Sequence, residues 1–306
     1  MNTTINGPVK KIAGISLPIL ALMWVSIAWG STWIASKIGI RQVPALQLCA
    51  MRQIIAGLIW ISFFVIRKHS FPDKQQWKII LLLALFNFTL SNALSTWGIH
   101  YISAGLGAIL AAIFPLWIVI IYFLKRQKIA LLAVLGMLMG FAGVCIIFYD
   151  HLKDFMVPGF SFGILISVIA TITWAIGSVY TQKEVDNFNP YFGLGLQMLI
   201  SGIFLYPVAK ITGQTIPLAA INGDSWLALC YLILVGSIAT FAAYVYTLKH
   251  LPIAVASVYA YINPVVAVLL GIYIFKERIT MGILAGGAVI LAGVYLVNYA
   301  TKNNKE

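Results

Sequence analysis

The chain has 306 residues, of which 61% are hydrophobic and only 9% are charged. Ordinary globular proteins are about 45–50% apolar and about 25% charged, so this chain lacks the charges that a water-soluble surface needs. The composition excludes a secreted domain, a disordered chain and a typical cytosolic enzyme, and it indicates a polytopic membrane protein. In a soluble protein, the formal net charge of +12 would suggest binding to nucleic acid. In a membrane protein, the first question is on which side of the membrane the charged residues lie.

The N-terminal segment and the cysteines carry no sign of secretion. The apolar run from Ile12 to Ser36 is too long for a signal peptide and has no small-residue cleavage site, so we expect a retained first span. Cys49, Cys145 and Cys230 lie in apolar stretches, which predicts buried thiols rather than disulfides or a metal cluster.

The hydrophobic residues divide the chain into spans. A helix needs about 20 apolar residues to cross about 30 Å of hydrocarbon. This length predicts ten transmembrane helices, at 17–36, 44–66, 77–97, 103–124, 129–149, 160–181, 191–209, 226–248, 252–275 and 281–299. The connections between them are short and polar, so no separate soluble domain is expected.

Lysine and arginine are unevenly divided between the two sides of these spans. With a cytoplasmic N-terminus, thirteen lie in cytoplasmic segments and six in outer segments. The positive-inside rule therefore places both termini in the cytoplasm of a bacterial cell, with the protein in its plasma (inner) membrane. Much of the net charge then faces anionic lipid, so we expect the bilayer as a partner and no nucleic acid.

The two halves of the chain match each other at an offset of 149 residues. The matched positions are tryptophans, small residues and prolines: Trp77 with Trp226, Ala111 with Ala260, and Pro115 with Pro264. At slightly smaller offsets, Gly30-Ser31 also matches Gly177-Ser178, and Gly57 matches Gly202. We predict two repeats of five helices, 12–149 and 160–299; because five is odd, the second repeat is inverted, as in many secondary transporters.

Several of these segments resemble the drug/metabolite transporter superfamily, EamA type. They are Trp29-Gly30-Ser31-Thr32-Trp33, the stretch from Ala45 to Leu58 with Arg52, the two segments that lead to Pro115 and Pro264, and the stretch from Phe275 with Glu277 to Val294. The resemblance covers nearly the whole chain and implies a transporter of small molecules. The chain departs from the pattern at Gln127, where members of the family often carry a glutamate.

Arg52 is the charged residue that lies deepest in the predicted spans. It is eight residues beyond Pro44, about 12 Å along a helix, and no aspartate or glutamate lies in any predicted span. A charge at that depth is expensive and faces the bundle interior by default. A guanidinium suits a substrate carboxylate. A structural role with backbone carbonyls or Glu277, and snorkelling towards the interface, are the alternatives.

Polar and aromatic side chains indicate a central cavity. Asn87, Ser91 and Ser95 form one helical stripe with Asn92 beside it, and Thr240 and Tyr244 lie at the equivalent positions of the second repeat. Helix packing through hydrogen bonds explains such stripes equally well. Trp29, Trp174 and Tyr259 suit the walls of a site or an interfacial belt. The predicted substrate-binding residues are Trp29, Ser31, Arg52, Asn87, Ser91, Asn92, Trp174, Gln197, Thr240, Tyr244, Tyr259 and Asn263.

Other features bear on mechanism. Pro115 and Pro264 each remove a helical hydrogen bond, and we expect them to bend gating helices. Gly136-x-x-x-Gly140 and Gly282-x-x-x-Gly286 suit close helix packing within a monomer or across a dimer, and we expect a monomer. No phosphate-binding loop, metal-ligand cluster or catalytic constellation is present, so we expect no cofactor, no metal and no enzymatic activity.

We therefore expect a secondary transporter of small metabolites, an exporter of amino acids or related carboxylates that works by alternating access. Glu184 and Glu277 are the candidate residues for proton coupling, and the alternative is that transport is not coupled to protons. The alternatives are an uncoupled facilitator or channel and, from a different class, a membrane enzyme acting on lipid, which the spans lack the acid and base residues to support.

Overall fold

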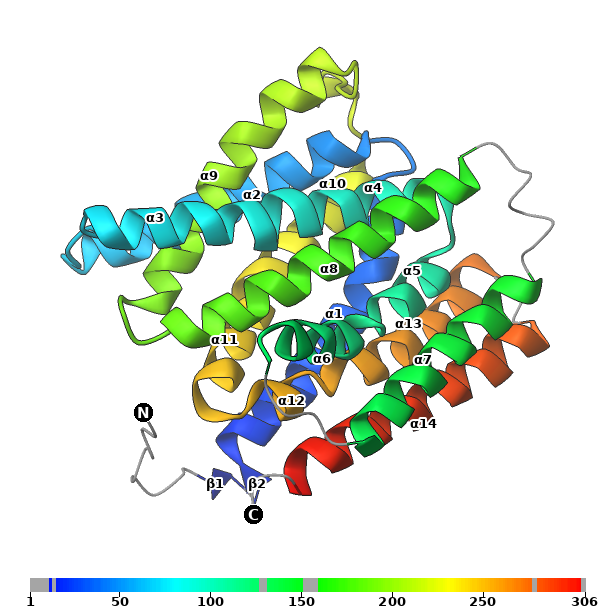
Figure 1. The fold of residues 1–306 in the computed structure, drawn as a ribbon. Helices are drawn as coiled ribbons and strands as arrows, with labels where there is room; N and C mark the ends of the chain where they lie inside the picture. Colours follow the sequence, from blue (N-terminus) through cyan, green and yellow to red (C-terminus); the bar gives the residue numbers. More distant parts are fainter. Residues whose placement is uncertain (1–10, 13–14, 127–130, 151–158, 277–279, 304–306) are drawn as a thin grey trace.

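The computed structural model describes residues 11–12, 15–126, 131–150, 159–276 and 280–303, and its ribbon is almost entirely helical (Figure 1). Within these ranges, seven helices are long and apolar enough to cross a membrane. They are Leu17–Gly39 (α1), Ala45–Ile66 (α2), Lys74–Tyr101, Ala104–Leu124, Phe160–Glu184 (α8), Pro190–Ile211 (α9) and Gly223–His250. Each falls on one of the predicted spans.

The other three predicted spans also fall on helices, so the number ten stays a prediction. These helices are α7 (Leu131–Asp150), the pair α12 (Ile253–Ala256) and α13 (Tyr259–Phe275), and α14 (Met281–Asn303). The sequence did not indicate two small additions, a 3₁₀ turn at Leu218–Ala220 (η3) and the two-residue strands β1 (Lys11–Ile12) and β2 (Ile15–Ser16), which pair antiparallel before α1.

Three of the long helices are composite. Lys74–Tyr101 consists of α3 (Lys74–Leu83), the π-helix η1 (Ala84–Asn92) and α4 (Ala93–Tyr101), and Gly223–His250 consists of α10 (Gly223–Tyr231), the π-helix η4 (Leu232–Ala239) and α11 (Thr240–His250). Ala104–Leu124 is broken between α5 (Ala104–Ala111) and α6 (Phe114–Leu124). The wide turns of a π-helix often mark functional sites, and here they occur at matching places in the two halves.

Helix ends also recur at the offset found in the sequence. The side chains of Asp73 and Asn222, 149 positions apart, cap the N-termini of α3 and α10. At the other ends, Lys37 Nζ donates to the carbonyls of Ile99 and Ile102 (2.5 and 2.7 Å). Gln182 Nε2 donates to those of Leu248 and Leu251 (3.1 and 3.0 Å). Different side chains thus satisfy the last carbonyls of α4 and α11 in the same way.

The glycine motifs pack inside the chain. In Figure 1, α7 and α14 lie side by side, and they are the most extensively packed helix pair. A Cβ atom at Gly143 would come within 2.6 Å of the Gly286 carbonyl oxygen, and one at Gly293 within 2.5 Å of that of Gly136. These glycines therefore bring the two helices of one molecule into backbone contact.

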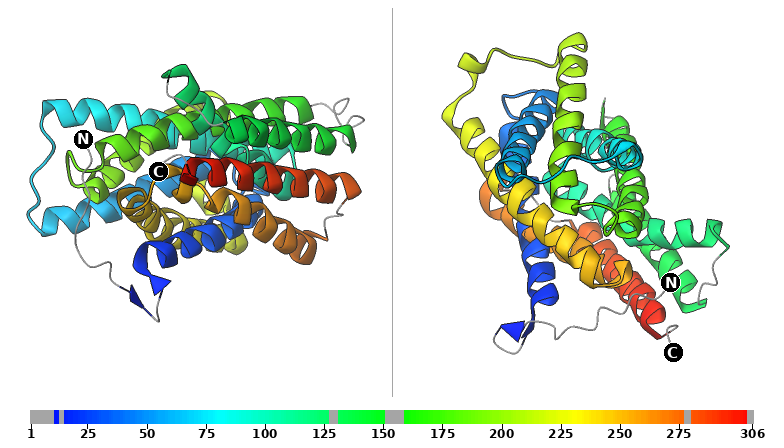
Figure 2. Two further views of the ribbon diagram at one scale, coloured as in Figure 1. Left: turned by 60° about the horizontal axis from the view of Figure 1, so that its bottom comes forward. Right: turned by 90° about the vertical axis from the view of Figure 1, so that its left-hand side faces the viewer.

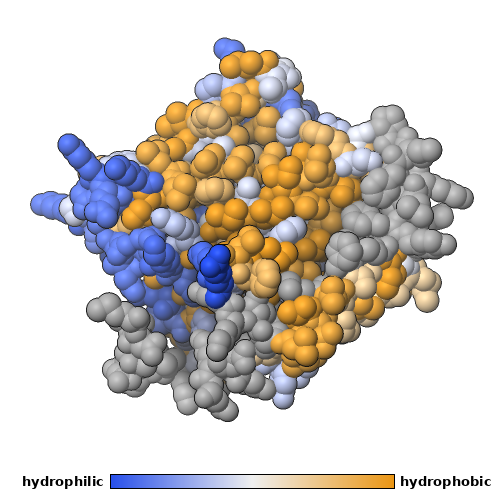
Figure 3. Space-filling model, viewed as in Figure 1, coloured by the Kyte–Doolittle hydropathy of each residue, from blue (hydrophilic) through white to orange (hydrophobic). Residues whose placement is uncertain are grey.

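The outer surface of the molecule is apolar. Figure 3 shows hydrophobic residues over most of one face, with hydrophilic residues gathered at the end where α3 begins. Exposed side chains on the long helices include Phe63, Ile203, Phe204 and Leu227. Several of the helices run in roughly one direction, as in the left view of Figure 2. A soluble monomer rarely exposes so large an apolar surface, whereas lipid tails would cover it.

Candidate functional site

A cavity of about 130 Å³ lies between the helices at the centre of the molecule. Its volume is close to that of an engineered cavity, about 150 Å³, that binds benzene. It gathers side chains from both halves of the chain. Seven of the predicted substrate-binding residues line it: Trp29, Arg52, Ser91, Asn92, Trp174, Tyr259 and Asn263. We call this space the first cavity.

Arg52 supplies the charge of the first cavity. The side chain is 7% exposed. Its Nε donates to Ser237 Oγ on η4 (2.7 Å), and its Nη1 lies 3.4 Å from Asn92 Oδ1 at the end of η1. Gly236 lets the guanidinium lie against η4, because a Cβ there would come within 3.0 Å of Arg52 Nη2. Both π-helices thus contribute a side-chain oxygen to the guanidinium.

Arg52 has no carboxylate partner in the part of the chain that the structure describes. The ion pairs found there join Lys183 with Glu184 and Lys249 with Asp186. Glu277, the acid considered as a structural partner, lies outside the described residues. A buried cation whose contacts are neutral oxygens favours an anion in the adjoining space.

The polar wall of the first cavity extends beyond the predicted residues. Thr32 and Ser36 on α1, Ser95 and Thr96 on α4, and Thr171 on α8 also line it. Trp29, Thr32, Trp33 and Ser36 form one helical face, a spacing of three and four residues that could have been recognised in the sequence. The contribution of Thr171 depends on how α8 packs, which the sequence does not display.

Aromatic rings close one end of the first cavity. Five residues, which we call the aromatic layer, form this group: Trp29, Trp174, Phe241, Tyr244 and Tyr259. The ring of Trp29 lies 4.9–5.6 Å from the other four rings, centroid to centroid. These separations are those of favourable aromatic pairs.

Hydrogen bonds fix the orientation of the aromatic layer. Trp174 Nε1 donates to the Tyr259 hydroxyl (2.5 Å), and the Tyr244 hydroxyl donates to Ser178 Oγ (2.9 Å). Trp29 Nε1 donates to the Gly236 carbonyl (3.2 Å), one of the carbonyls of η4. The polar atoms of the rings are therefore satisfied within the protein, and the layer is well ordered.

A second, smaller cavity of about 20 Å³ lies on the other side of the aromatic layer. Along α8, Thr171 lines the first cavity, Trp174 lines both, and Thr181 and Glu184 line the second. Thr171 and Thr181 are about 15 Å apart along the helix axis, so the layer separates the two spaces. The predicted residues Asn87, Gln197 and Tyr244 line the second cavity rather than the first.

Four predicted residues line neither cavity. The Ser31 hydroxyl donates to the Ala28 carbonyl, and it lies 2.6 Å from the Tyr231 hydroxyl. The Thr240 hydroxyl donates to the Val235 carbonyl of η4 (2.7 Å). Pro115 is the second residue of α6, directly after the break that follows α5, and Pro264 lies inside α13. Ser31 and Thr240 have structural contacts here, and the gating role of the prolines stays a prediction.

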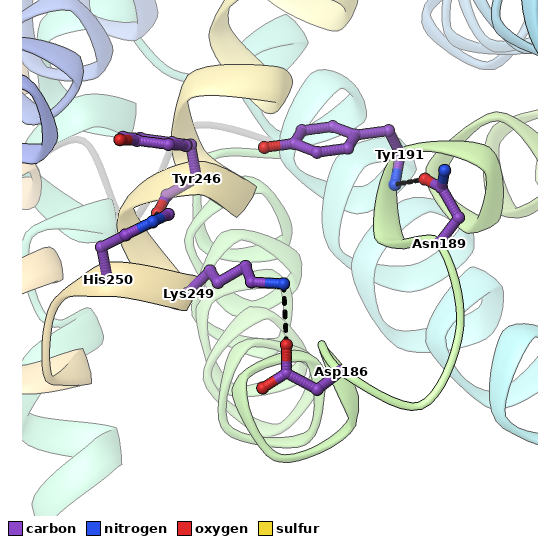
Figure 4. A network of polar contacts seen from close by, with 6 residues as sticks. All are labelled: Asp186, Asn189, Tyr191, Tyr246, Lys249 and His250. Atoms are coloured by element: carbon purple, nitrogen blue, oxygen red, sulfur yellow. Dashed lines mark hydrogen bonds and ion pairs between the residues drawn. The ribbon is translucent and has the colours of Figure 1, made fainter. Parts of the chain in front are cut away.

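The end of the molecule next to the second cavity is held by a polar network (Figure 4). Lys249, at the end of α11, reaches across to Asp186 in the α8–α9 connection, with Nζ 2.8 Å from Oδ1. Asn189 caps α9 by accepting from the backbone N–H groups of Tyr191 and Phe192 (3.1 Å each). The Lys249–Asp186 ion pair and the hydrogen bonds of Gln182 join the end of α11 to α8 and to the α8–α9 connection.

Comparison with known families identifies a matching model twice along the chain. The model of the EamA-like transporter family matches residues 16–149 and 161–299. A relative in Escherichia coli strain K12, named an uncharacterized inner membrane transporter, YedA, is 31% identical over 282 residues, which is 91% of this chain and 90% of the relative. A Bacillus subtilis strain 168 protein named an uncharacterized transporter, YvbV, is 29% identical over 305 residues, which is 94% of this chain and 93% of the relative.

A plant relative and a solved structure extend the comparison. A WAT1-related protein of Arabidopsis thaliana, described as chloroplastic, is 26% identical over 286 residues, which is 90% of this chain and 68% of that protein. A solved crystal structure superposes with a TM-score of 0.70 at 18% identity and covers 94% of this chain and 99% of its own. The fold is thus one already seen experimentally.

Proposed function

Because the chain belongs to the EamA-like transporter family, we propose that this multi-pass membrane transporter exports small carboxylate-bearing metabolites, amino acids among them, through its central cavity. The observation that carries the substrate class is Arg52, a buried guanidinium beside the first cavity with no carboxylate partner in the described residues. An incoming carboxylate would form charge-assisted hydrogen bonds with this guanidinium.

The rest of the first cavity supports a small substrate. Hydroxyl and amide groups on one wall, such as Ser91, Ser95 and Asn92, offer hydrogen bonds, while Trp29, Trp33 and Tyr259 offer apolar contact. A site with a few polar groups among aromatic walls is typical of small-molecule recognition. Its volume of about 130 Å³ suits a molecule of a few heavy atoms in this conformation.

The proposed mechanism is alternating access between the two sides of the membrane. With the termini in the cytoplasm, the first cavity faces outwards and the aromatic layer closes it from the cytoplasm. Export then requires a second conformation in which the layer parts and the second cavity opens inwards. The two repeats, matched from Trp29 and Trp174 to the ends of α4 and α11, provide the symmetry that such an exchange uses.

A facilitator is the competing function, because no carboxylate lines the first cavity among the described residues and so none offers a coupling group there. The test is flux in reconstituted vesicles of a metabolite that cells excrete in response to this protein. Saturable uptake that is accelerated by the same metabolite on the opposite side supports the transporter. Linear flux without that acceleration supports the facilitator.

A further inference from the structure

Four exposed cations lie where α2 ends and α3 begins. Arg67 and Lys68 directly follow α2, and Lys74 and Lys78 lie in the first two turns of α3. None of the four has a carboxylate partner among the described residues. Asp73 is the one carboxylate in this segment, and its Oδ1 is used to cap α3. We call the four cations the basic edge; in Figure 3, hydrophilic surface gathers at this end of the molecule.

The turn at the end of α2 does not account for its two cations. α2 and α9 end in the same kind of turn, in which Lys68 (φ 56°) and Gly213 (φ 69°), 145 positions apart, are left-handed. In both turns the next backbone N–H donates back to the helix (3.0 and 2.7 Å). Glycine adopts this conformation without the steric cost that lysine carries. Arg67 likewise matches the neutral Thr212.

The start of α3 shows the same contrast with the second repeat. At the offset of 149 positions, Lys74 and Lys78 match Gly223 and Leu227 of α10. Yet α10 begins with the same kind of side-chain cap as α3. The basic edge is therefore an addition to one copy of a framework that both repeats share.

The exposed face of α3 changes from charged to apolar along its length. Lys74, Lys78 and Leu81 are four and three residues apart and share one face, whereas Ile80 on another face is buried. Leu81 is 52% exposed, about 10 Å along the axis from Lys74, and Leu85 beyond it is also exposed. A molecule lying along this face meets two cations first and an apolar surface next.

We propose that this part of the surface binds one phospholipid with a negatively charged headgroup, its phosphate at Lys74 and Lys78 and an acyl chain against Leu81 and Leu85. Two ammonium groups one turn apart suit a phosphate. A choline or ethanolamine headgroup would bring a further positive charge to the basic edge, so phosphatidylglycerol fits better than a zwitterionic lipid. The inference goes beyond the proposed transport function, and it assigns one site rather than the general attraction of basic segments to anionic membranes.

The test counts lipids on the purified protein. The protein in detergent is titrated with phosphatidylglycerol or phosphatidylcholine of identical acyl chains, and native mass spectrometry gives the dissociation constant of the first bound lipid. We expect phosphatidylglycerol to bind about ten-fold more tightly. The double variant Lys74→Gln with Lys78→Gln should bind the two lipids equally, whereas Lys74→Arg with Lys78→Arg keeps both charges and should keep the preference.

A matched control separates a site from diffuse surface charge. Lys125→Gln with Arg126→Gln removes two exposed cations that follow α6, and it should keep the preference for phosphatidylglycerol. Loss of the preference in this control as large as in the α3 variant would overturn the proposal, as would a wild-type protein that binds both lipids equally. Equal unfolding midpoints without lipid show that the variants fold.

A second arm separates a lipid from a free phosphate. Glycerol 3-phosphate has the anion without the acyl chains, and we expect it to leave phosphatidylglycerol bound when both are present at the same concentration. Displacement of the lipid would show a site for a phosphate anion and reject a lipid site. Because binding is measured without transport, neither result depends on the proposed function.

Discussion

Trp29 and Trp174 are 145 positions apart, like Lys37 and Gln182 with their equivalent contacts and unlike the 147 of the Gly30 and Gly177 match, and they meet edge to face with ring centroids 5.6 Å apart between the two cavities. Each comes from a helix that begins its repeat, α1 or α8. Their contact therefore brings together one ring from each half of the molecule between the two cavities. Trp29 also packs against Phe241, Tyr244 and Tyr259, so it is the central ring of the aromatic layer.

Removing that central ring should connect the cavities. We expect Trp29→Ala to produce a slow leak of small solutes that rises linearly with concentration, because the side chain separates the two spaces. Trp29→Phe retains a ring and should keep saturable flux. Proteoliposome uptake measures both. Trp24→Ala is the matched control, since Trp24 on the same helix is 47% exposed on the surface. A leak equal to that of Trp24→Ala would show that the layer does not seal the pathway.

The close approach of α2 and α9 predicts an effect on stability. A Cβ atom at Gly57 would lie 2.6 Å from the backbone nitrogen of Leu199, and backbone cannot move aside as a side chain can. We expect Gly57→Ala to destabilise the fold by about 1–3 kcal/mol, seen as a lower midpoint of thermal unfolding in detergent. Gly287→Ala, where nothing lies within 4 Å of the added atom, should leave the midpoint unchanged or raise it slightly.

The ion pair between Lys249 and Asp186 holds the C-terminal end of α11 to the α8–α9 connection. Exposed pairs contribute about 0.2–1 kcal/mol. In a variant that carries Thr181→Cys and lacks Cys49, Cys145 and Cys230, Lys249→Gln should therefore raise the rate at which a water-soluble thiol reagent labels the introduced cysteine by a few-fold at most. The double variant Lys249→Asp with Asp186→Lys should return the rate to that of the parent. Unchanged labelling in Lys249→Gln would mean that the pair does not limit opening.

Much of the architecture could be predicted because membrane helices obey simple rules. Length and hydropathy located the seven long apolar helices, and the depth of Arg52 singled out the charged group of the cavity. The π-helices were not predictable, since η1 and η4 depend on outside side chains: Trp29 and Gln53 donate to the carbonyls of Gly236 and Phe88. For the same reason Thr240, predicted to face a cavity, bonds instead to a carbonyl of η4.

The second cavity also could not be predicted from the sequence. Asn87 and Gln197 were expected to share one site with Arg52, because each is polar and lies within a span. In the structure the aromatic layer divides them from it, and that division depends on how Trp174 and Phe241 pack across the two repeats. Repeat symmetry predicts which residues correspond, but only the packing decides on which side of a barrier they lie.

Arg52 is the residue on which the proposed substrate class depends. Arg52→Gln should weaken transport of carboxylate-bearing substrates roughly ten-fold or more, because a hydrogen bond to a charged group contributes about 1.5–3 kcal/mol. Transport of neutral solutes should fall much less. Lys210→Gln, which removes an exposed cation near the end of α9, is the matched control. Equal loss for charged and neutral solutes would indicate a structural role instead.

The most direct measurement compares the metabolites excreted by cells that produce the wild-type protein, the Arg52→Gln variant at equal membrane abundance, or neither. The account predicts that small molecules bearing a carboxylate accumulate in the medium with the wild-type protein and do not with the variant. Excretion of the same carboxylates by the variant at the wild-type rate, or excretion confined to molecules without a carboxylate, would contradict it.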